Sequence, residues 1–381
     1  ASAASEQYET SLLEATLRKI ASLLQVGLGA AGSEIIAKNI SDGGELQPLI
    51  KGRKVYAVFG FCDIRCFTDT TECLQEDVMV FVNIIGEIVH SAVHQFGGAA
   101  NKNIGDAFLL VWKLPSELPP DGLGVGKDLS GIEFNSKCSS FYEALPAPPL
   151  VRMADNALAS FLKVIVDIHH ANEHGSLAPY ATRPEIKGRF EDTFSVKMGY
   201  GLHVGWAIEG AIGSSFKIDA SYLSPHVNLS SRLEAATKQY ATPLLMSGSF
   251  FALLSEHARR RCRRLDRVTV KGSKAPMELY TFDVCNFPMA FAQPPMKRLL
   301  FHVDPKVQAL QADVPDDFFV AFEQAVSHYL DGDWGKAKAA LDQALALRPH
   351  DGPSETLQSV MSETDYVAPE SWPGYRVLTE K

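Results

Sequence analysis

Apolar residues are spaced in two ways along the chain, and the spacing predicts the secondary structure. Short runs rich in Val, Phe, Tyr and Leu predict strands at residues 51–64, 107–112, 195–209, 267–271 and 276–284. The strand at 195–209 is also rich in glycine, which indicates that another part of the backbone approaches it closely. No helix-opening GxGxxG follows a strand there, so the glycines do not indicate a dinucleotide-binding loop.

Longer stretches in which apolar residues return every three or four positions predict helices at 6–40, 74–96, 151–173, 226–238 and 316–347. In the first stretch Leu13, Leu17, Ile20 and Leu24 form one apolar stripe. Two roles remain open for it. It is either a helix packed on its own domain or a dimerising stalk.

The ends of these helices are marked by local signals. Thr68, Asp69 and Thr70 offer N-cap side chains to the second helix, and Gly97-Gly98 end it. The last stretch is interrupted near Gly332, so it predicts a helical hairpin that resembles one tetratricopeptide repeat. A single repeat cannot bury its own faces, so we expect it to pack on the preceding domain.

The pattern divides the chain into three parts. Residues 1–50 form an N-terminal helical segment, 51–290 the main domain, and 291–381 the C-terminal hairpin and a tail. Residues 113–150 hold many Pro, Gly and Ser without periodicity, which predicts a long surface insertion in the main domain. The tail from Trp372 is expected to extend along the surface of the hairpin.

Composition describes an ordinary globular protein with an ample core: 381 residues, 46% hydrophobic and 21% charged. The net charge of −9 disfavours general nucleic-acid binding. Six cysteines without paired metal spacing indicate free thiols and a cytoplasmic location. No apolar run spans a bilayer, since Asn83 and Glu87 interrupt the longest, 78–93. A membrane or sensor region upstream of residue 1 stays open.

Two charged segments have ordinary interpretations. Residues 257–271 are the only basic run, and we interpret them mostly as a solvated face beside the strand at 267–271. His169, His170 and His174 lie near the end of a predicted helix, where histidine is favoured, so we expect a solvated helix end and not a metal site.

Two aspartates stand at the ends of predicted strands. Asp63 ends the first strand, and Asp106 follows Gly105 at the tip of a predicted hairpin over residues 99–112. A strand-end aspartate alone is most often a solvated turn residue. Two of them on adjacent strand ends can instead bridge a pair of hard divalent cations, an arrangement suited to phosphoryl transfer.

The sequence around these aspartates resembles the signature of the class III nucleotide cyclases. The resemblance rests on Phe61-Cys-Asp-Ile-Arg-Cys-Phe-Thr68, on Lys102-Asn-Ile-Gly-Asp106 and on Val227-Asn-Leu-Ser-Ser-Arg-Leu-Glu-Ala235, in that order, and covers roughly residues 51–285. It implies an α+β fold with a ferredoxin-like βαββαβ core, and cyclisation of a nucleoside triphosphate with release of pyrophosphate.

The resemblance also implies roles for particular residues. Asp63, Asp106 and the backbone carbonyl of Ile64 would hold two Mg²⁺ or Mn²⁺ ions. Asn228 would orient the ribose, and Arg232, four positions later and on the same helix face, would stabilise the pentavalent phosphorus. Contacts to the triphosphate are expected from backbone N–H groups at the start of the following helix and from a lysine: Phe67, Thr68 and Lys271.

Base choice follows from hydrogen-bond types. Adenine offers an acceptor at N1 and a donor at N6, which a lysine and an aspartate complement, and guanylyl cyclases carry glutamate where Lys102 stands. ATP is therefore the expected substrate. The aspartate partner is Asp219 if the loop has a two-residue insertion, and the family position otherwise falls on Ser221. One catalytic domain with a complete set of residues implies a head-to-tail homodimer.

Two other functions remain as alternatives. The first is a guanylyl cyclase, which competition between GTP and ATP in turnover assays would reveal. The second is a non-catalytic nucleotide-sensing or scaffolding module that acts through its helical hairpin. Retention of Asp63, Asp106, Asn228 and Arg232 argues against a decayed site. Diguanylate synthesis and a polymerase palm are disfavoured by the Asn/Arg helix.

Overall fold

A computed structural model describes residues 11–23, 27, 51–114, 149–214, 217–270, 275–292, 301 and 304–378. The predicted insertion at 113–150, apart from its first and last residues, lies outside the described residues, as does Lys271. Residues 11–23 are helical, and Leu13, Leu17 and Ile20 on their apolar stripe are exposed. The described part of this helix is therefore not packed on the rest of the chain.

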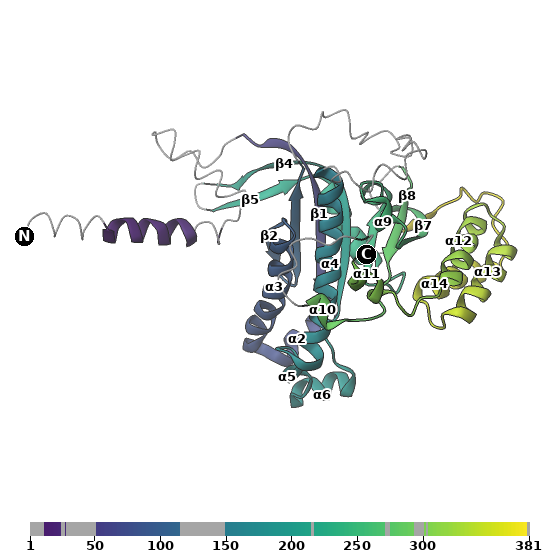
Figure 1. The fold of residues 1–381 in the computed structure, drawn as a ribbon, viewed down its shortest axis with the longest axis horizontal. Coiled ribbons are helices and arrows are strands. Elements are labelled where there is room, and N and C mark those ends of the chain that lie inside the picture. The colour runs from purple at the N-terminus through teal and green to yellow at the C-terminus, as the bar shows by residue number, and fades with distance from the viewer. Residues whose placement is uncertain are drawn as a thin grey trace, which may run out of the picture.

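A central sheet forms the middle layer of the molecule (Figure 1). Among the described residues it has nine strands, in the order β2-β3-β1-β4-β6-β8-β7-β9, with β5 paired to β4. The strands are β1 (Arg53–Ile64), β2 (Ala99–Ile104), β3 (Ala107–Lys113), β4 (Met198–Gly213), β5 (Ile218–Leu223), β6 (Leu244–Ser247), β7 (Cys262–Val270), β8 (Met277–Phe282) and β9 (Arg376–Leu378). β1 lies between antiparallel β3 and β4, which confirms the ferredoxin-like βαββαβ core.

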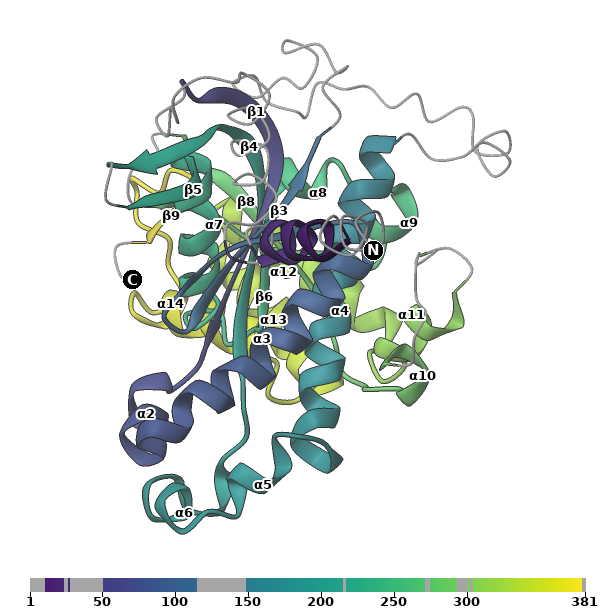
Figure 2. The ribbon, with the colours of Figure 1, turned by 90° about the vertical axis from the view of Figure 1, so that its left-hand side faces the viewer.

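Two long helices cover one face of the sheet, as Figure 2 shows. They are α3 (Val78–Gln95) and α4 (Pro149–His174), and their apolar sides pack on alternate residues of the strands, such as Val58 on β1. The helical stretch Phe67–Gln95 has the length and hydropathy of a membrane span, the one such stretch in the described part of the chain. The buried Phe81 and Ile85 of α3 show that its inward side belongs to the core.

The first helix after β1 begins earlier than predicted. α2 (Phe67–Leu74) starts directly after Cys66, whose φ of 54° is left-handed, and no side chain caps it. Thr68 to Thr70 therefore lie inside the first turns of α2, and the expectation that they cap the next helix is wrong. A 3₁₀ turn (Gln75–Asp77) separates α2 from α3. The left-handed Gly97 follows the end of α3, as predicted.

The opposite face of the sheet carries α7 (Pro225–Ala236) and the C-terminal unit, by which we mean residues 314–378. This unit comprises α12 (Asp316–Leu330), α13 (Trp334–Leu347), α14 (Gly352–Ser362) and β9. The short α11 (Pro305–Leu310) precedes it and instead places Val307 and Leu310 in the core shared with α3 and α4. The predicted hairpin is α12 and α13, and it packs on the sheet as expected. The tail lies along it, with the Trp372 indole donating a hydrogen bond to the Leu330 carbonyl.

The interpretation of residues 257–271 as a mostly solvated face is wrong for β7. Arg263 is buried, and its guanidinium pairs with Asp283 at 2.8 Å and with Asp351 at 2.7 Å. Arg264, the next residue of the strand, pairs with Glu278 and with Glu323 of α12. The C-terminal unit covers this strand, so its basic side chains meet acidic ones instead of water.

The remaining helices are short. They are α5 (Ala178–Ala181), α6 (Pro184–Phe190), a 3₁₀ turn (Glu191–Thr193), α8 (Gly248–Phe251), α9 (Glu256–Arg259) and α10 (Met289–Ala292). His169 and His170 at the end of α4 are half-buried and His174 is exposed, and His169 stacks on Phe287. The described cysteines, five of the six, have free thiols.

Candidate active site

Strand pairing brings Asp63 and Asp106 together. Asp63 is opposite Ala107 across the β1–β3 ladder, and the backbone N–H of Ile64 donates to the Asp106 carbonyl at 3.3 Å. The left-handed Gly105 makes the tight turn that places Asp106 directly before β3. Hence the two carboxyl groups lie within hydrogen-bonding reach of each other at one end of the sheet.

The surroundings of Asp63 oppose its negative charge. Burial, together with the charges of Glu234 and Asp106 and a hydrogen bond to Asp106, raises the pKa of Asp63 to about 7. Two carboxylates held together in this way form a donor set for a hard cation, and Mg²⁺ typically takes one or two carboxylates and completes its shell with water and phosphate oxygens. No group of three His, Cys, Asp or Glu side chains in the described ranges forms a metal site of its own. The pair therefore fits a metal shared with a phosphate-bearing ligand.

Arg65 links this pair to α7, a contact that was not predicted. Its guanidinium forms an ion pair of 2.7 Å with the buried Glu234 and also donates to the hydroxyl of Thr237. A Cβ on Gly199 would overlap this guanidinium, so only glycine leaves room for it. Arg65 and Glu234 both lie inside the sequence motifs that mark the site, and those motifs were the signal from which the contact could have been predicted.

Glycines in β4 let α7 lie directly on the sheet. A Cβ at Gly201 would come within 2.2 Å of the Ser230 carbonyl oxygen, and one at Gly205 within 2.1 Å of the His226 ring. The predicted close approach to this strand is thus confirmed. His226 in turn hydrogen-bonds to the buried His203 at 2.8 Å, which anchors the first turn of the helix.

Asn228 and Arg232 share one side of α7, as their spacing predicts. Together with Trp206, Leu223 and His226 they line an open groove between α7 and the β4–β5 ribbon. Burial lowers the pKa of His226 in this groove. Three apolar side chains of the ribbon are exposed to solvent: Ile208, Ile212 and Leu223.

Lys102 and Asp219 meet although they are far apart in sequence. The Lys102 ammonium donates to the Asp219 carboxylate at 2.9 Å, and both side chains remain more than a third exposed. The hydrogen bond and the charge of Lys102 lower the pKa of Asp219. Asp219 is opposite Ile212 in the ribbon, whereas Ser221 is opposite Gly210.

Glu209 fixes the root of this ribbon, and no sequence pattern indicated it. The buried carboxylate accepts hydrogen bonds from Arg53 at 2.9 Å and from the Tyr222 hydroxyl at 2.7 Å, and it pairs with Lys113. Burial would raise the pKa of Glu209, but these partners outweigh it and hold the pKa below its usual value. Strand β5, which carries Asp219, is thereby tied to β1 and β3.

Phe67 and Thr68 lie in the first turn of α2, directly after the strand end that carries Asp63. Backbone N–H groups of a first helical turn have no partner within the helix and are available to an anion. The predicted contact from Lys271 lies outside the described residues.

The site thus combines a carboxylate pair at one end of a βαββαβ sheet with an Asn/Arg helix packed on that sheet. The family model described as adenylate and guanylate cyclase catalytic domain matches residues 54–284, more than half of the chain. The chain therefore belongs to the class III nucleotide cyclase family, whose members use divalent metal ions. A second model, RasGEFs all helical domain, matches residues 1–41, of which the structure describes only a part.

Curated relatives of the chain are larger proteins. An adenylate cyclase from Anabaena cylindrica is 26% identical over 223 residues, which are 58% of this chain and 35% of the relative. The adenylate cyclase, terminal-differentiation specific, of Dictyostelium discoideum is 25% identical over 222 residues, 58% of this chain and 8% of the relative. The chain thus spans about a third or less of their length. A bacterial light-regulated adenylyl cyclase structure shares the fold, with a TM-score of 0.50, 22% identity and coverage of 75% of this chain and 67% of that one.

Proposed function

We propose that this chain is an adenylyl cyclase that converts ATP into 3′,5′-cyclic AMP and pyrophosphate. The observation that carries the proposal is the carboxylate pair Asp63 and Asp106 at one sheet end, in a chain that also keeps Asn228 and Arg232 on one side of α7. The curated relatives named above are adenylate cyclases, which supports the same activity.

The reaction joins two parts of one molecule. The ribose 3′-oxygen forms a bond to the α-phosphorus, the bond from that phosphorus to the bridging oxygen of the β-phosphate breaks, and the hydroxyl proton leaves to solvent. Attacker and electrophile are already linked, so the protein has to fold the substrate and stabilise charge. In this assignment Arg232 donates its planar fork to the phosphoryl oxygens, and Asn228 orients the ribose.

Asp63, Asp106 and the Ile64 carbonyl would hold two Mg²⁺ or Mn²⁺ ions. Bound there, the ions would supply charge neutralisation at the phosphates and a lower pKa for the 3′-hydroxyl. The N–H groups at Phe67 and Thr68 then donate hydrogen bonds to phosphate oxygens at the start of α2, and Lys271 is assigned to the same triphosphate. The closeness of the two carboxyl groups supports this placement.

Lys102 and Asp219 select the base. Their ion pair of 2.9 Å supports Asp219 over Ser221 as the aspartate partner, because it holds a donor and an acceptor side by side near the exposed tip of the ribbon. Adenine N1 accepts from the lysine and N6 donates to the aspartate. Guanine offers the opposite pattern, so ATP is the proposed substrate and guanylyl cyclase activity the second candidate.

The working form is proposed to be a head-to-tail homodimer. Arg232 and Glu234 are two positions apart on α7, which is about 200° around a helix. Glu234 faces Arg65 beside the metal carboxylates, so Arg232 of the same chain is turned away from them. A second copy would bring its own carboxylates to the groove and cover the exposed Ile208 and Leu223.

Two further proposals concern the context of the chain. The free thiols support a cytoplasmic location for this part of the protein. The exposed stripe of the helix at 11–23 supports the dimerising role left open above, over a helix packed on its own domain.

The activity is tested by incubating the chain with ATP and Mn²⁺ and resolving the products by chromatography. Cyclic AMP and pyrophosphate are expected in equal amounts, with none after chelation by EDTA or in Asp63→Ala. Removing Arg232 is expected to lower kcat by about 10²–10³, as for other single electrostatic donors. Asp316→Ala, an exposed carboxylate on α12, is the matched control and keeps full activity. Absence of a cyclic product from both ATP and GTP would rule the proposal out.

The dimer is tested by mixing inactive variants. Asp106→Ala and Arg232→Ala chains each lack one half of the site, so each heterodimer regains one complete site and activity returns. Competition of GTP against ATP in the same assay, with wild type and Lys102→Glu, separates the two cyclase activities. Full activity in a strictly monomeric protein by analytical ultracentrifugation would contradict the dimer.

A further inference from the structure

The C-terminal unit shares a hydrophobic core with α7. Leu233 and Ala236 on the inner side of this helix, and Tyr240 in the turn after it, belong to one buried cluster with residues of the C-terminal unit, among them Phe322 of α12 and Leu357 of α14. Figure 1 shows α12, α13 and α14 beside the β7–β8 end of the sheet. The catalytic helix is therefore held between the glycines of β4 and the C-terminal unit.

The start of α14 touches the turn that follows α7. The Thr356 hydroxyl donates to the Gln239 carbonyl at 3.0 Å. A Cβ added to Gly352 would lie 2.6 Å from both the Cβ and the carbonyl oxygen of Ala241. Such a distance forces either α14 or the turn to move, so the backbone of α14 is fitted closely against the end of the catalytic helix.

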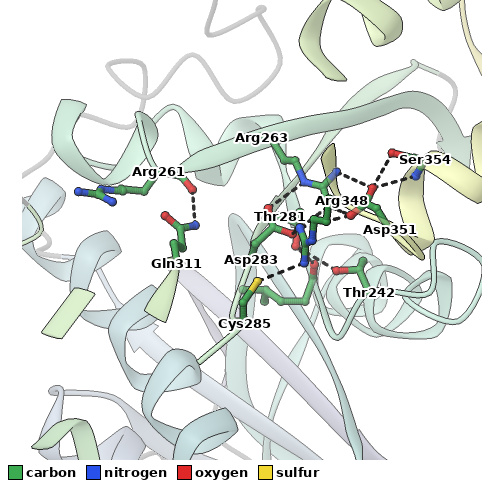
Figure 3. Close-up of polar contacts among 11 residues, drawn as sticks. Thr242, Arg261, Arg263, Thr281, Asp283, Cys285, Gln311, Arg348, Asp351 and Ser354 are labelled. Atoms are coloured by element: carbon green, nitrogen blue, oxygen red, sulfur yellow. Dashed lines mark hydrogen bonds and ion pairs between the residues drawn. The ribbon is translucent and has the colours of Figure 1, made fainter. Parts of the chain in front are cut away.

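Buried charges fix the position of α14. Figure 3 shows Arg263 between Asp283 and Asp351, with Arg348 completing the cluster. Asp351 also caps α14 by accepting from the Ser354 N–H at 3.0 Å. The first turn of α14 is thus bound to the strands β7 and β8 through side chains that are almost entirely excluded from water.

A second buried contact ties the tail to the same turn. The Tyr240 hydroxyl donates to Asp266 at 2.6 Å, and Arg376 of β9 pairs with the same carboxylate at 3.2 Å. β9 itself adds a parallel strand to β7, with Val268 opposite Arg376. The turn after α7 is therefore held from α14 on one side and from β9 on the other.

We infer that the C-terminal unit positions α7 and, through it, Asn228 and Arg232 for the reaction. Gly352 and Thr356 are positioning residues in this assignment, since they contact the turn after α7 and not the substrate. The inference rests on the proposed function for its kinetic part. A displacement of about 1 Å at a catalytic group can lower a rate by about 100-fold, so a modest shift of α7 has a measurable effect.

Heterodimers separate positioning from general stability. An Asp106→Ala chain contributes α7 to the one complete site, and an Arg232→Ala chain contributes the carboxylates. Gly352→Ala placed in the first chain is expected to lower kcat about tenfold or more, and placed in the second chain to leave it within about twofold. Thr356→Val, which removes one hydrogen bond, is expected to act in the same direction with roughly a threefold loss. Lys338→Ala, in an exposed ion pair of the same unit, is the control without effect in either chain.

Hydrogen exchange gives a readout independent of activity. In full-length Gly352→Ala and Thr356→Val, amides of 225–241 are expected to exchange faster than in wild type, while those of β1 and β3 are unchanged. Equal kinetic loss from both chains, or unchanged exchange at 225–241, would overturn the inference. If the wild-type chain makes no cyclic nucleotide, the proposed function fails, and the exchange measurement still decides whether the C-terminal unit holds α7.

Discussion

Replacing Arg263 by Met tests the buried ion cluster. The guanidinium binds Asp283 through two hydrogen bonds of 2.8 Å and Asp351 through bonds of 3.0 and 2.7 Å, and the three side chains are at most 5% exposed. Its removal leaves two buried carboxylates with Arg348 as their remaining cation. Breaking a buried pair in this way costs about 3–5 kcal/mol.

The expected loss is large enough to measure as a melting temperature. At about 2.1 cal/mol/K per residue the unfolding entropy of this chain is roughly 0.8 kcal/mol/K, so the Arg263→Met variant should melt about 4–6 °C below wild type. Arg264→Met is the matched control. Its partners Glu278 and Glu323 are 41% and 52% exposed, and such pairs contribute about 1 kcal/mol or less.

The pH dependence gives a second check. Burial would raise the pKa of Asp283, but Arg263 and Arg348 outweigh it and hold the pKa below its usual value. In wild type this carboxyl therefore stabilises the fold above the unfolded pKa of about 3.9 and loses that effect as pH falls through the folded pKa. In Arg263→Met the effect of burial on Asp283 dominates and raises its pKa. The loss of unfolding free energy relative to wild type is therefore greatest near pH 7.5 and shrinks toward pH 4.

Calorimetry of both variants and wild type at pH 7.5 and pH 4.5 measures these differences. Groups that titrate in all three proteins cancel in the comparison. An equal effect of Arg263→Met and Arg264→Met, or a deficit that widens in acid, would refute the reasoning.

Three further predictions concern stability. Burial, with the charge of His226, lowers the pKa of His203 to about 3. The free energy of unfolding should therefore fall by about 1.4 kcal/mol for each pH unit below pH 6.5, because the unfolded chain binds a proton that the folded chain excludes. Urea titrations of His203→Asn should show a weaker dependence of this free energy on pH. Gly201→Ala should destabilise the fold by about 1–3 kcal/mol, because its Cβ meets the backbone of α7, whereas Gly188→Ala in α6, with open space around it, should gain up to about 1 kcal/mol; equal effects in thermal melts would contradict this. Cys66→Gly should raise stability by up to about 1 kcal/mol, since φ is 54° there, and a lower melting temperature would count against it.

The sequence predicted those parts of the site that depend on local signals. Asp63 ends one apolar run and Asp106 stands directly before another, so their strand ends were readable, and the glycines of 195–209 indicated the close approach that α7 makes. The hairpin was expected to pack on the domain because one repeat has an unburied face. The pairing of Lys102 with Asp219 depended on a family motif and on an assumed insertion, and the ribbon geometry favours that alignment.

Contacts across long sequence separations were not predictable from pattern. Arg263 stands in a basic run that looks solvated, and its partner Asp351 is 88 residues away with no periodicity to connect them. Glu209 and Tyr222 meet only once β4 and β5 have paired. The start of α2 was missed because Thr68 and Thr70 are good capping residues, whereas the helix follows the left-handed Cys66 without a side-chain cap.

The family match ends at Val284, but the folded body does not. A recombinant fragment cut at that point would keep Leu233 and Tyr240 while losing the helices that cover them. It would also lack β9, the edge strand of the sheet, so the backbone N–H and C=O groups of β7 would be free to pair with strands of other chains. Such a fragment is expected to aggregate on expression, so soluble material should require the sequence through Leu378.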